Sequence, residues 1–431
     1  MPDPRHDTTL SALVERITAG EIGPSEVIAG ALERLDRTEP DIRAWVRVDR
    51  DGAMKAAREL ADAPTAGPLR GIPVGVKDII DVRGLPTECG SPLRQGSEPA
   101  ADDAPVVARL RRLGAIPLGK TVTTEFAYFS PGPTRNPHNS AHTPGGSSSG
   151  SAAAVAAGVV PLALGSQTAG SLTRPAAYCG VAGFVVPAGG PLNTEGFQAL
   201  APSLDAVGLL TPTVADLRLA YGALTEARRL PDPLEPPSRP RLAVWSGAEL
   251  GEIAPDMKAA LAWSAERAVA SGAVLVDVDL SVRTPRLVEA QTTVMAYEAA
   301  RTLATEGATP ERLSAPLNEL LAQGRAVTDA DYRHALSVAR RERAELLALL
   351  TEVDAVLGPA TLGPAPQGLT ATGSPVLSRP WQVLGLSALT VPGHRDRRGM
   401  PLGLQLVGHP DHLDRLFELG HAVELAARAR R

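Results

Sequence analysis

The sequence predicts an α/β fold in which helices surround a mixed central β-sheet. Short apolar segments recur along the chain, and helical patterns separate many of them, an alternation that is typical of such folds. The 431 residues, 44% of them hydrophobic and 21% charged, match ordinary globular proteins and suffice for a substantial core. We therefore expect one domain spanning residues 1 to 431.

Helices open the chain. Leu10, Leu13, Val14 and Ile17 recur at helical spacing, and "PSEVIAGALERLDR" starts with Pro24 and a capping candidate before another apolar stripe. Further helical patterns cover residues 104 to 113, 255 to 271 and 413 to 427.

Short buried strands are predicted between these helices. Each is a brief apolar run bounded by glycine, proline or polar residues. They cover residues 71 to 78, 115 to 120, 159 to 165, 241 to 247, 273 to 280, 353 to 359 and 401 to 408.

A proline-rich stretch, "LPDPLEPPSRPR" at residues 230 to 241, is too dense in proline for either regular element. It either divides domains or crosses the surface. No repeat of 20 to 50 residues accompanies it, and we expect a surface segment of the single domain.

Composition excludes several function classes. The net charge is −5, and no basic stripe alternates with aromatic residues, so we expect no nucleic-acid partner. The longest apolar run, residues 152 to 164, is broken by Gly158 and Pro161, and we expect no membrane span. Cys89 and Cys179 form neither a disulfide framework nor a zinc motif. With no signal peptide at the N-terminus, a cytoplasmic enzyme without metal or cofactor is expected.

The stretch "PGGSSSGSAAAVAAG", residues 144 to 158, allows three interpretations. A flexible linker is the first, but the small-residue helix and strand that follow anchor the stretch. A phosphate cradle is the second, but neither nucleotide-binding glycine motif matches. A catalytic role is the third.

Two other stretches favour the catalytic interpretation. "GSQTAGSLTRPAAYCG", residues 165 to 180, is a second small-residue turn that follows a predicted strand, with Ser171 at its apex. The predicted strand "GIPVGVKD" carries Lys77 among apolar residues, where a cation is unfavourable unless it is used.

At these residues the chain resembles the amidase signature family of serine amide hydrolases. "GPLRGIPVGVKDIIDVRGLPT", "LGKTVTTEFA", "RNPHNSAHTPGGSSSGSAAAVAAG" and "GSQTAGSLTRPAAYCGVAGF" occur in family order, within a core of about residues 66 to 227. The resemblance weakens over residues 240 to 350 and returns in "VDAVLGPATLGPAP", "PWQVLGLSALTVPG" and "MPLGLQLVGHP".

The resemblance implies roles for particular residues. Ser171 corresponds to the nucleophile, Ser147 to a serine that follows a cis peptide bond, and Lys77 to the base. The residues implied to form the oxyanion hole with their backbone N–H groups are Thr168, Ala169, Gly170 and Ser171. Gly146 and Gln167 are expected to line the substrate site. Ser166 and Ser148 are expected to form hydrogen bonds around the triad of Lys77, Ser147 and Ser171, or to cap a helix and pack closely against its neighbours.

The implied chemistry is physically reasonable. An alcohol attacks an amide only when a base takes its proton. Lys77 must therefore be largely neutral, and lowering its pKa by ~3 units corresponds to roughly 4 kcal/mol, which burial supplies when no carboxylate touches the amine. Strand alternation directs Asp78 to the opposite face.

Arg174 departs from the common family pattern, because it lies three residues after Ser171 rather than two. Malonamidase-like members share this placement, which implies that Arg174 either binds a substrate carboxylate or forms a structural ion pair. Two further departures alter the family pattern. Ser166 and Gln167 stand where many relatives have Thr-Asp, and "GFVVPAGG" replaces a segment that carries a lysine and an arginine in relatives.

We therefore predict an amidase that hydrolyses a small-molecule carboxamide through an acyl-enzyme on Ser171. A Ser/His/Asp mechanism is disfavoured, because no histidine accompanies a G-x-S-x-G elbow. Two alternatives stay open: the amidase component of a glutamine-dependent amidotransferase, and a catalytically silent binding protein of the same fold. Dimers are common among relatives, so a homodimer is one expected assembly.

Overall fold

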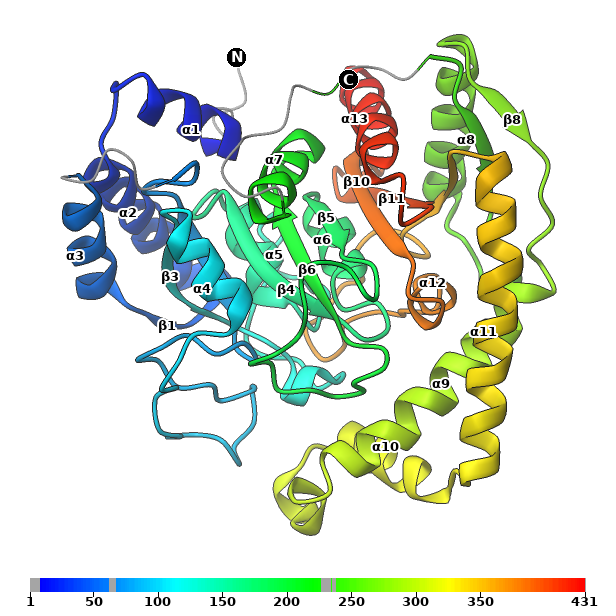
Figure 1. The fold of residues 1–431 in the computed structure, drawn as a ribbon, viewed down its shortest axis with the longest axis horizontal. Coiled ribbons are helices and arrows are strands. Elements are labelled where there is room, and N and C mark those ends of the chain that lie inside the picture. Colours follow the sequence, from blue (N-terminus) through cyan, green and yellow to red (C-terminus); the bar gives the residue numbers. More distant parts are fainter. Residues whose placement is uncertain (1–7, 62–66, 226–233, 235–237, 431) are drawn as a thin grey trace.

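The computed structural model describes residues 8–61, 67–225, 234 and 238–430. Most of the proline-rich stretch at 230 to 241, and both ends of the expected signature core at 66 and 227, lie outside the described residues. Figure 1 shows a central sheet with helices packed around it, and a pair of long helices, α9 and α11, that extends to one side.

The central sheet is mixed, as predicted. Among the described residues it has eleven strands in the order β1-β3-β2-β4-β6-β5-β10-β11-β9-β7-β8. β2 pairs in parallel with β3 and β4, and β7 with β8 and β9, whereas the remaining pairs are antiparallel. The strands are β1 (Trp45–Val48), β2 (Pro73–Lys77), β3 (Ile116–Thr121), β4 (Leu162–Gln167), β5 (Ala182–Val185), β6 (Ala206–Thr211), β7 (Arg241–Val244), β8 (Val274–Val276), β9 (Ala355–Pro359), β10 (Ser387–Arg395) and β11 (Pro401–Gly408).

The helices include every helical pattern found in the sequence. They are α1 (Leu10–Thr18), α2 (Pro24–Ile42), α3 (Arg50–Ala61), α4 (Pro105–Arg112), α5 (Ser149–Ala156), α6 (Thr173–Cys179), α7 (Val214–Thr225), α8 (Pro255–Ala270), α9 (Arg283–Thr302), α10 (Ala315–Ala326), α11 (Asp329–Glu352), α12 (Arg379–Val383) and α13 (Leu413–Ala429). In the described part of the chain, no helix is long and apolar enough to cross a membrane.

All seven predicted strands form: β11 has the predicted bounds, β3 and β4 begin and end slightly later than predicted, and the other four are shorter than the apolar runs that indicated them. Four strands, β1, β5, β6 and β10, were not predicted. β10 contains Pro392, and its register against β11 shifts between Val391 and His394, so proline and a bulge interrupt its pattern.

Small residues let two short helices pack against the middle of the sheet. The residues of α5 and α6 are all buried. A side chain at Gly150 would collide with the backbone of Ala44 and Val122, at 2.2 and 2.4 Å. Close packing of α5 against this backbone therefore requires a glycine at position 150.

Candidate active site

Lys77 ends the central strand β2, between β3 and β4. Its side chain is fully buried, and Nζ lies 2.6 Å from Ser147 Oγ and 2.8 Å from Ser166 Oγ. Asp78 points to the other face, as strand alternation predicts, where it pairs with Lys120 at 2.9 Å. The nearest neighbours of the Lys77 amine are thus hydroxyl groups rather than a carboxylate.

The pKa of Lys77 is lowered to about 7, because burial removes the water that would solvate an ammonium. The negative charge of Asp205 acts in the opposite direction, and the positive charge of Arg174 lowers this pKa further. Lys77 is therefore largely neutral slightly above neutral pH.

Ser147 and Ser148 connect Lys77 to the turn of Ser171. The Gly146–Ser147 peptide bond is cis. The Ser148 N–H donates to the Ser171 carbonyl at 3.0 Å, and Ser148 Oγ makes two 3.2 Å hydrogen bonds with the Ser166 backbone. The two serine-bearing turns therefore lie side by side.

The turn before Ser171 leaves its backbone donors free. Within the described part of the chain, the N–H groups of residues 168 to 171 donate to no protein acceptor. Gly170 packs against Pro375, since a Cβ on Gly170 would lie 2.8 Å from the proline side chain. Unpaired N–H groups beside a serine can stabilise a developing oxyanion.

Gln167 is directed at the backbone that follows Ser171. Its side-chain oxygen accepts the N–H groups of Leu172 and Thr173, both at 3.0 Å, and its amide donates to Gln382 at 3.0 Å. These contacts make Gln167 a residue that holds the turn of Ser171 in place.

Arg174 is buried and donates to two backbone carbonyls, those of Gly146 at 2.6 Å and Gly373 at 2.7 Å. Among the described residues no carboxylate pairs with it, so the structural ion pair considered from the sequence is wrong. Its Nε is buried and has no hydrogen-bond partner in the described part of the chain. Burial, with a smaller contribution from the charge of Arg379, lowers the pKa of Arg174 to about 10.

Arg379, the first residue of α12, was not predicted from the sequence to belong to the site. Its Nη1 contacts Thr292 Oγ1, and its Nε is also buried without a partner. Burial lowers its pKa. The charge of Arg379 thus acts on Arg174, and each guanidinium has one buried N–H donor without a partner among the described residues.

Other buried hydroxyls without a partner border the same turns. The Thr124 and Thr372 side chains lie against Gly146, and Ser378 lies near Gly170. The region around Ser147 and Ser171 is therefore suited to a small polar molecule.

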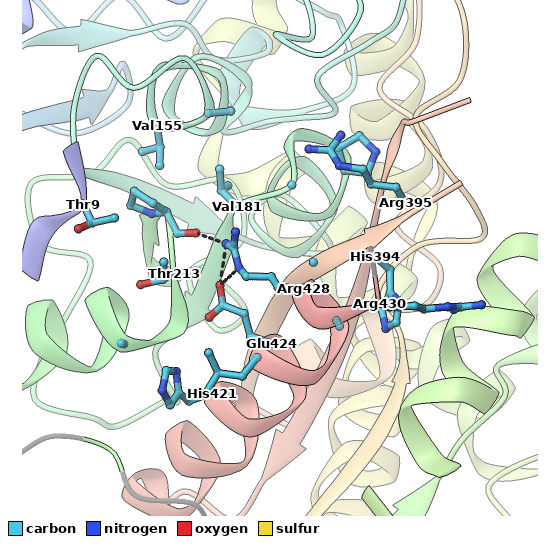
Figure 2. A pocket seen from close by; sticks show the side chains of 18 of the residues that line it. Thr9, Val155, Val181, Thr213, His394, Arg395, His421, Glu424, Arg428 and Arg430 are labelled. Atoms are coloured by element: carbon cyan, nitrogen blue, oxygen red, sulfur yellow. Dashed lines mark hydrogen bonds and ion pairs between the residues drawn. The ribbon is translucent and has the colours of Figure 1, made fainter. Parts of the chain in front are cut away.

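A cavity of about 960 Å³ lies elsewhere, between α1, α7, α13 and the end of β10. Figure 2 shows Arg428 in this cavity, paired with Glu424 at 2.7 Å, with His394 and His421 nearby. None of Lys77, Ser147 and Ser171 lines it. In the described residues no cluster of three His, Cys, Asp or Glu side chains could hold a metal ion.

Asp205 was also missed in the sequence. Thr168 Oγ1 donates to it at 2.5 Å, and burial raises its pKa to about 6. In the sequence, Asp205 is simply an acidic residue directly before β6, a strand that was not predicted.

Comparison with known proteins agrees with this geometry. A family model described as Amidase matches residues 26–415. A glutamyl-tRNA(Gln) amidotransferase subunit from Synechococcus sp. (strain CC9605) is 32% identical, over 98% of this chain and 97% of the relative.

Solved structures that resemble this chain include amidases. A crystal structure of an amidase is 32% identical with a TM-score of 0.87, and covers 97% of this chain and 99% of its own. The peptide amidase from Stenotrophomonas maltophilia is 30% identical with a TM-score of 0.82, over 99% of this chain and 98% of its own. The extent of these matches shows that this chain belongs to the amidase (amidase signature) family and is an amide hydrolase.

Proposed function

We propose that this amidase hydrolyses small-molecule carboxamides through an acyl-enzyme on Ser171. The observation that carries the proposal is the buried amine of Lys77, 2.6 Å from Ser147 Oγ, beside the turn that presents Ser171. A neutral amine can accept a proton from Ser147 while it donates to Ser166.

In the first half of the reaction, Ser171 Oγ attacks the amide carbon as its proton moves to Ser147, whose own proton moves to Lys77. The carbonyl oxygen becomes an oxyanion, which the free N–H groups of residues 168 to 171 stabilise. The C–N bond then breaks, and the proton returns from Lys77 through Ser147 to the leaving nitrogen. The products are an ester on Ser171 and an amine or ammonia.

In the second half, water attacks the ester carbon and gives its proton to Lys77 by the same route. The ester bond breaks, the proton passes to Ser171 Oγ, and a carboxylic acid leaves. Lys77 and Ser147 end in their starting protonation states.

The substrate is expected to carry a carboxylate. Arg174 is buried, the Arg379 Nε beside it is buried too, and neither guanidinium has a carboxylate partner among the described residues. Leaving two desolvated cations unpaired is unfavourable, and an anionic substrate would supply the missing charge.

Labelling with a fluorophosphonate probe tests the nucleophile. We expect the full-length protein to be labelled at Ser171 and Ser171→Ala to be unlabelled. Ser149→Ala is the matched control, because Ser149 begins α5 two residues after Ser147 and its hydroxyl donates to the Val122 carbonyl. Labelling at another serine contradicts the assignment.

Paired substrates test the arginines. For a monoamide of a dicarboxylic acid, we expect Arg379→Gln to lower kcat/KM by about 100-fold, the value of a lost charge-assisted contact. For a neutral amide of the same length, little change is expected. An equal loss for both substrates contradicts carboxylate binding.

The curated relative favours a second candidate, the amidase component of a glutamine-dependent amidotransferase. Glutamine also carries a carboxylate, so the same arginines would serve. Glutaminase activity, together with a second protein that co-purifies, would favour this candidate. A homodimer and a cytoplasmic location stay predictions.

A further inference from the structure

Asp205 lies beside the turn of Ser171 because of strand register. β4 and β6 are antiparallel, with Ser166 opposite Val207 and Gln167 opposite Ala206. One step beyond these pairs, Thr168 meets Asp205, and its hydroxyl donates to Asp205 Oδ1 at 2.5 Å.

The other carboxylate oxygen is held by the loop before β6. Asp205 Oδ2 accepts the N–H groups of Leu200 at 2.8 Å and Ala201 at 3.1 Å. The three donors lower the pKa of Asp205, but burial outweighs them and raises it to about 6. At neutral pH the group is therefore mostly ionised.

Helix α9 fixes this arrangement from a second side. Gln291 donates to the Thr168 carbonyl at 3.0 Å, and Glu298 accepts the N–H and hydroxyl of Ser203 at 2.9 and 2.5 Å. Thr168 is thus held by its side chain and its carbonyl, while its N–H stays free to face a substrate.

The charge of Asp205 reaches Lys77. Three groups act on the Lys77 amine: Asp205, the Cys89 thiol and Arg174. Burial raises the pKa of Cys89 to about 12, so the thiol is neutral, and Arg174 opposes protonation of the lysine. Asp205 therefore supplies the negative charge that raises the pKa of Lys77, against the lowering that burial causes.

We propose that Asp205 is a positioning residue for the hydrolysis proposed above: its carboxylate, held by the Leu200 and Ala201 N–H groups, holds Thr168 in the turn before Ser171. The same carboxylate carries the negative charge that acts on Lys77. The inference rests on the proposed function, because it assumes that Lys77 is the base and that the turn stabilises the oxyanion.

Asp205→Asn separates charge from shape. Asparagine can keep the contacts to Leu200 and Ala201 through its oxygen and can donate to Thr168 through its nitrogen. We expect the acidic limb of the pH profile for fluorophosphonate labelling, near pH 7 in the unmodified protein, to move down by on the order of 1 pH unit. An unmoved limb overturns the role of the charge.

Asp216→Asn is the matched control. Asp216 is another buried aspartate that accepts a backbone N–H, from Ser11, and it does not act on Lys77. We expect no shift of the acidic limb. A shift equal to that of Asp205→Asn overturns the proposal, because any buried carboxylate would then have the same effect.

Thr168 variants test positioning without a change of charge, and they remain decisive if Asp205→Asn does not fold. We expect Thr168→Val to lower the plateau labelling rate by about 10-fold, since small displacements of oxyanion donors are costly. Thr168→Ser should restore the rate because it keeps the hydroxyl. Equal rates for all three proteins overturn the positioning role.

The labelling measurement also separates the two proposals. If the unmodified protein is not labelled at Ser171, the proposed function fails. If it is labelled but the Asp205 and Thr168 variants behave like the unmodified protein, only the present inference fails.

Discussion

Lys77 is a residue whose burial works against stability. Its pKa is about 7 in the folded protein and about 10.4 in an unfolded chain, so between these values the unfolded state binds more protons. The free energy of unfolding therefore rises with pH from about 7 to about 10. Below pH 7 the full penalty of burying this amine applies.

We predict that Lys77→Met abolishes hydrolysis and stabilises the fold. Methionine has a similar length and no charge, so the free energy of unfolding at pH 7 should rise by about 2 to 4 kcal/mol. The gain should shrink as the pH approaches 10. Urea titrations at pH 7 and pH 9.5 measure both effects, and a gain that does not depend on pH would contradict the explanation.

At the scale of elements, α9 and α10 approach each other very closely. Gly324 of α10 faces the backbone of α9, where a Cβ would lie 1.8 Å from the Ala296 carbonyl oxygen. Gln291 of α9 also holds Thr168, so the packing of this pair bears on the turn of Ser171. Together with α11, these helices form the projecting part of the molecule in Figure 1.

We predict that Gly324→Ala lowers the free energy of unfolding by about 1 to 3 kcal/mol, because overpacking forces the two backbones apart. Gly30→Ala in α2 is the control. Its Cβ would meet only the flexible end of Arg34 at 3.3 Å, and alanine should stabilise that helix by about 0.5 to 1 kcal/mol. Thermal unfolding of both variants checks the contrast, and a Gly324→Ala protein as stable as the parent would refute it.

At the scale of the molecule, one apolar cluster runs through the described residues from Leu10 to Val423. It contains residues from both halves of the chain, including Phe184 and Phe417, whose ring centroids lie 4.8 Å apart. A continuous core of this kind favours the single domain expected from the sequence, which stays a prediction.

Cysteine labelling tests that expectation. Cys89 and Cys179 are buried, and burial raises the pKa of both thiols, so neither should react with a disulfide reagent in the native protein at pH 8. In urea, both thiols should become reactive over the same range in which the fluorescence of the four tryptophans changes. Labelling of Cys89 at lower urea than the fluorescence change would indicate two independently folding units.

Much of the fold could be predicted from local pattern. Apolar runs indicated seven strands, because burial on both faces leaves a continuous hydrophobic signal. β10 was missed, because Pro392 and a bulge break its pattern. β5, the four residues of "AGFV", gives too short a signal for a pattern to be recognised.

The candidate site likewise contains residues that could be predicted from the sequence and residues that could not. Lys77, Ser147 and Ser171 stand out in the sequence because a lysine within an apolar strand and two hydroxyl-bearing small-residue turns are locally unusual. Asp205 and Arg379 do not, since each is an ordinary charged residue next to an ordinary element. Asp205 becomes significant through its hydrogen bond with Thr168, and Arg379 through the effect of its charge on Arg174, each far away along the chain.

By itself, the sequence determined the alternation of strands and helices, the two small-residue turns and the family. The tertiary structure alone decided that Arg174 donates to backbone carbonyls, that Gln167 accepts the N–H groups that follow Ser171, and that Asp205 lies beside Thr168. The physical reason is that burial and strand register set the charge of a lysine and the neighbours of a carboxylate, and both are properties of the assembled sheet.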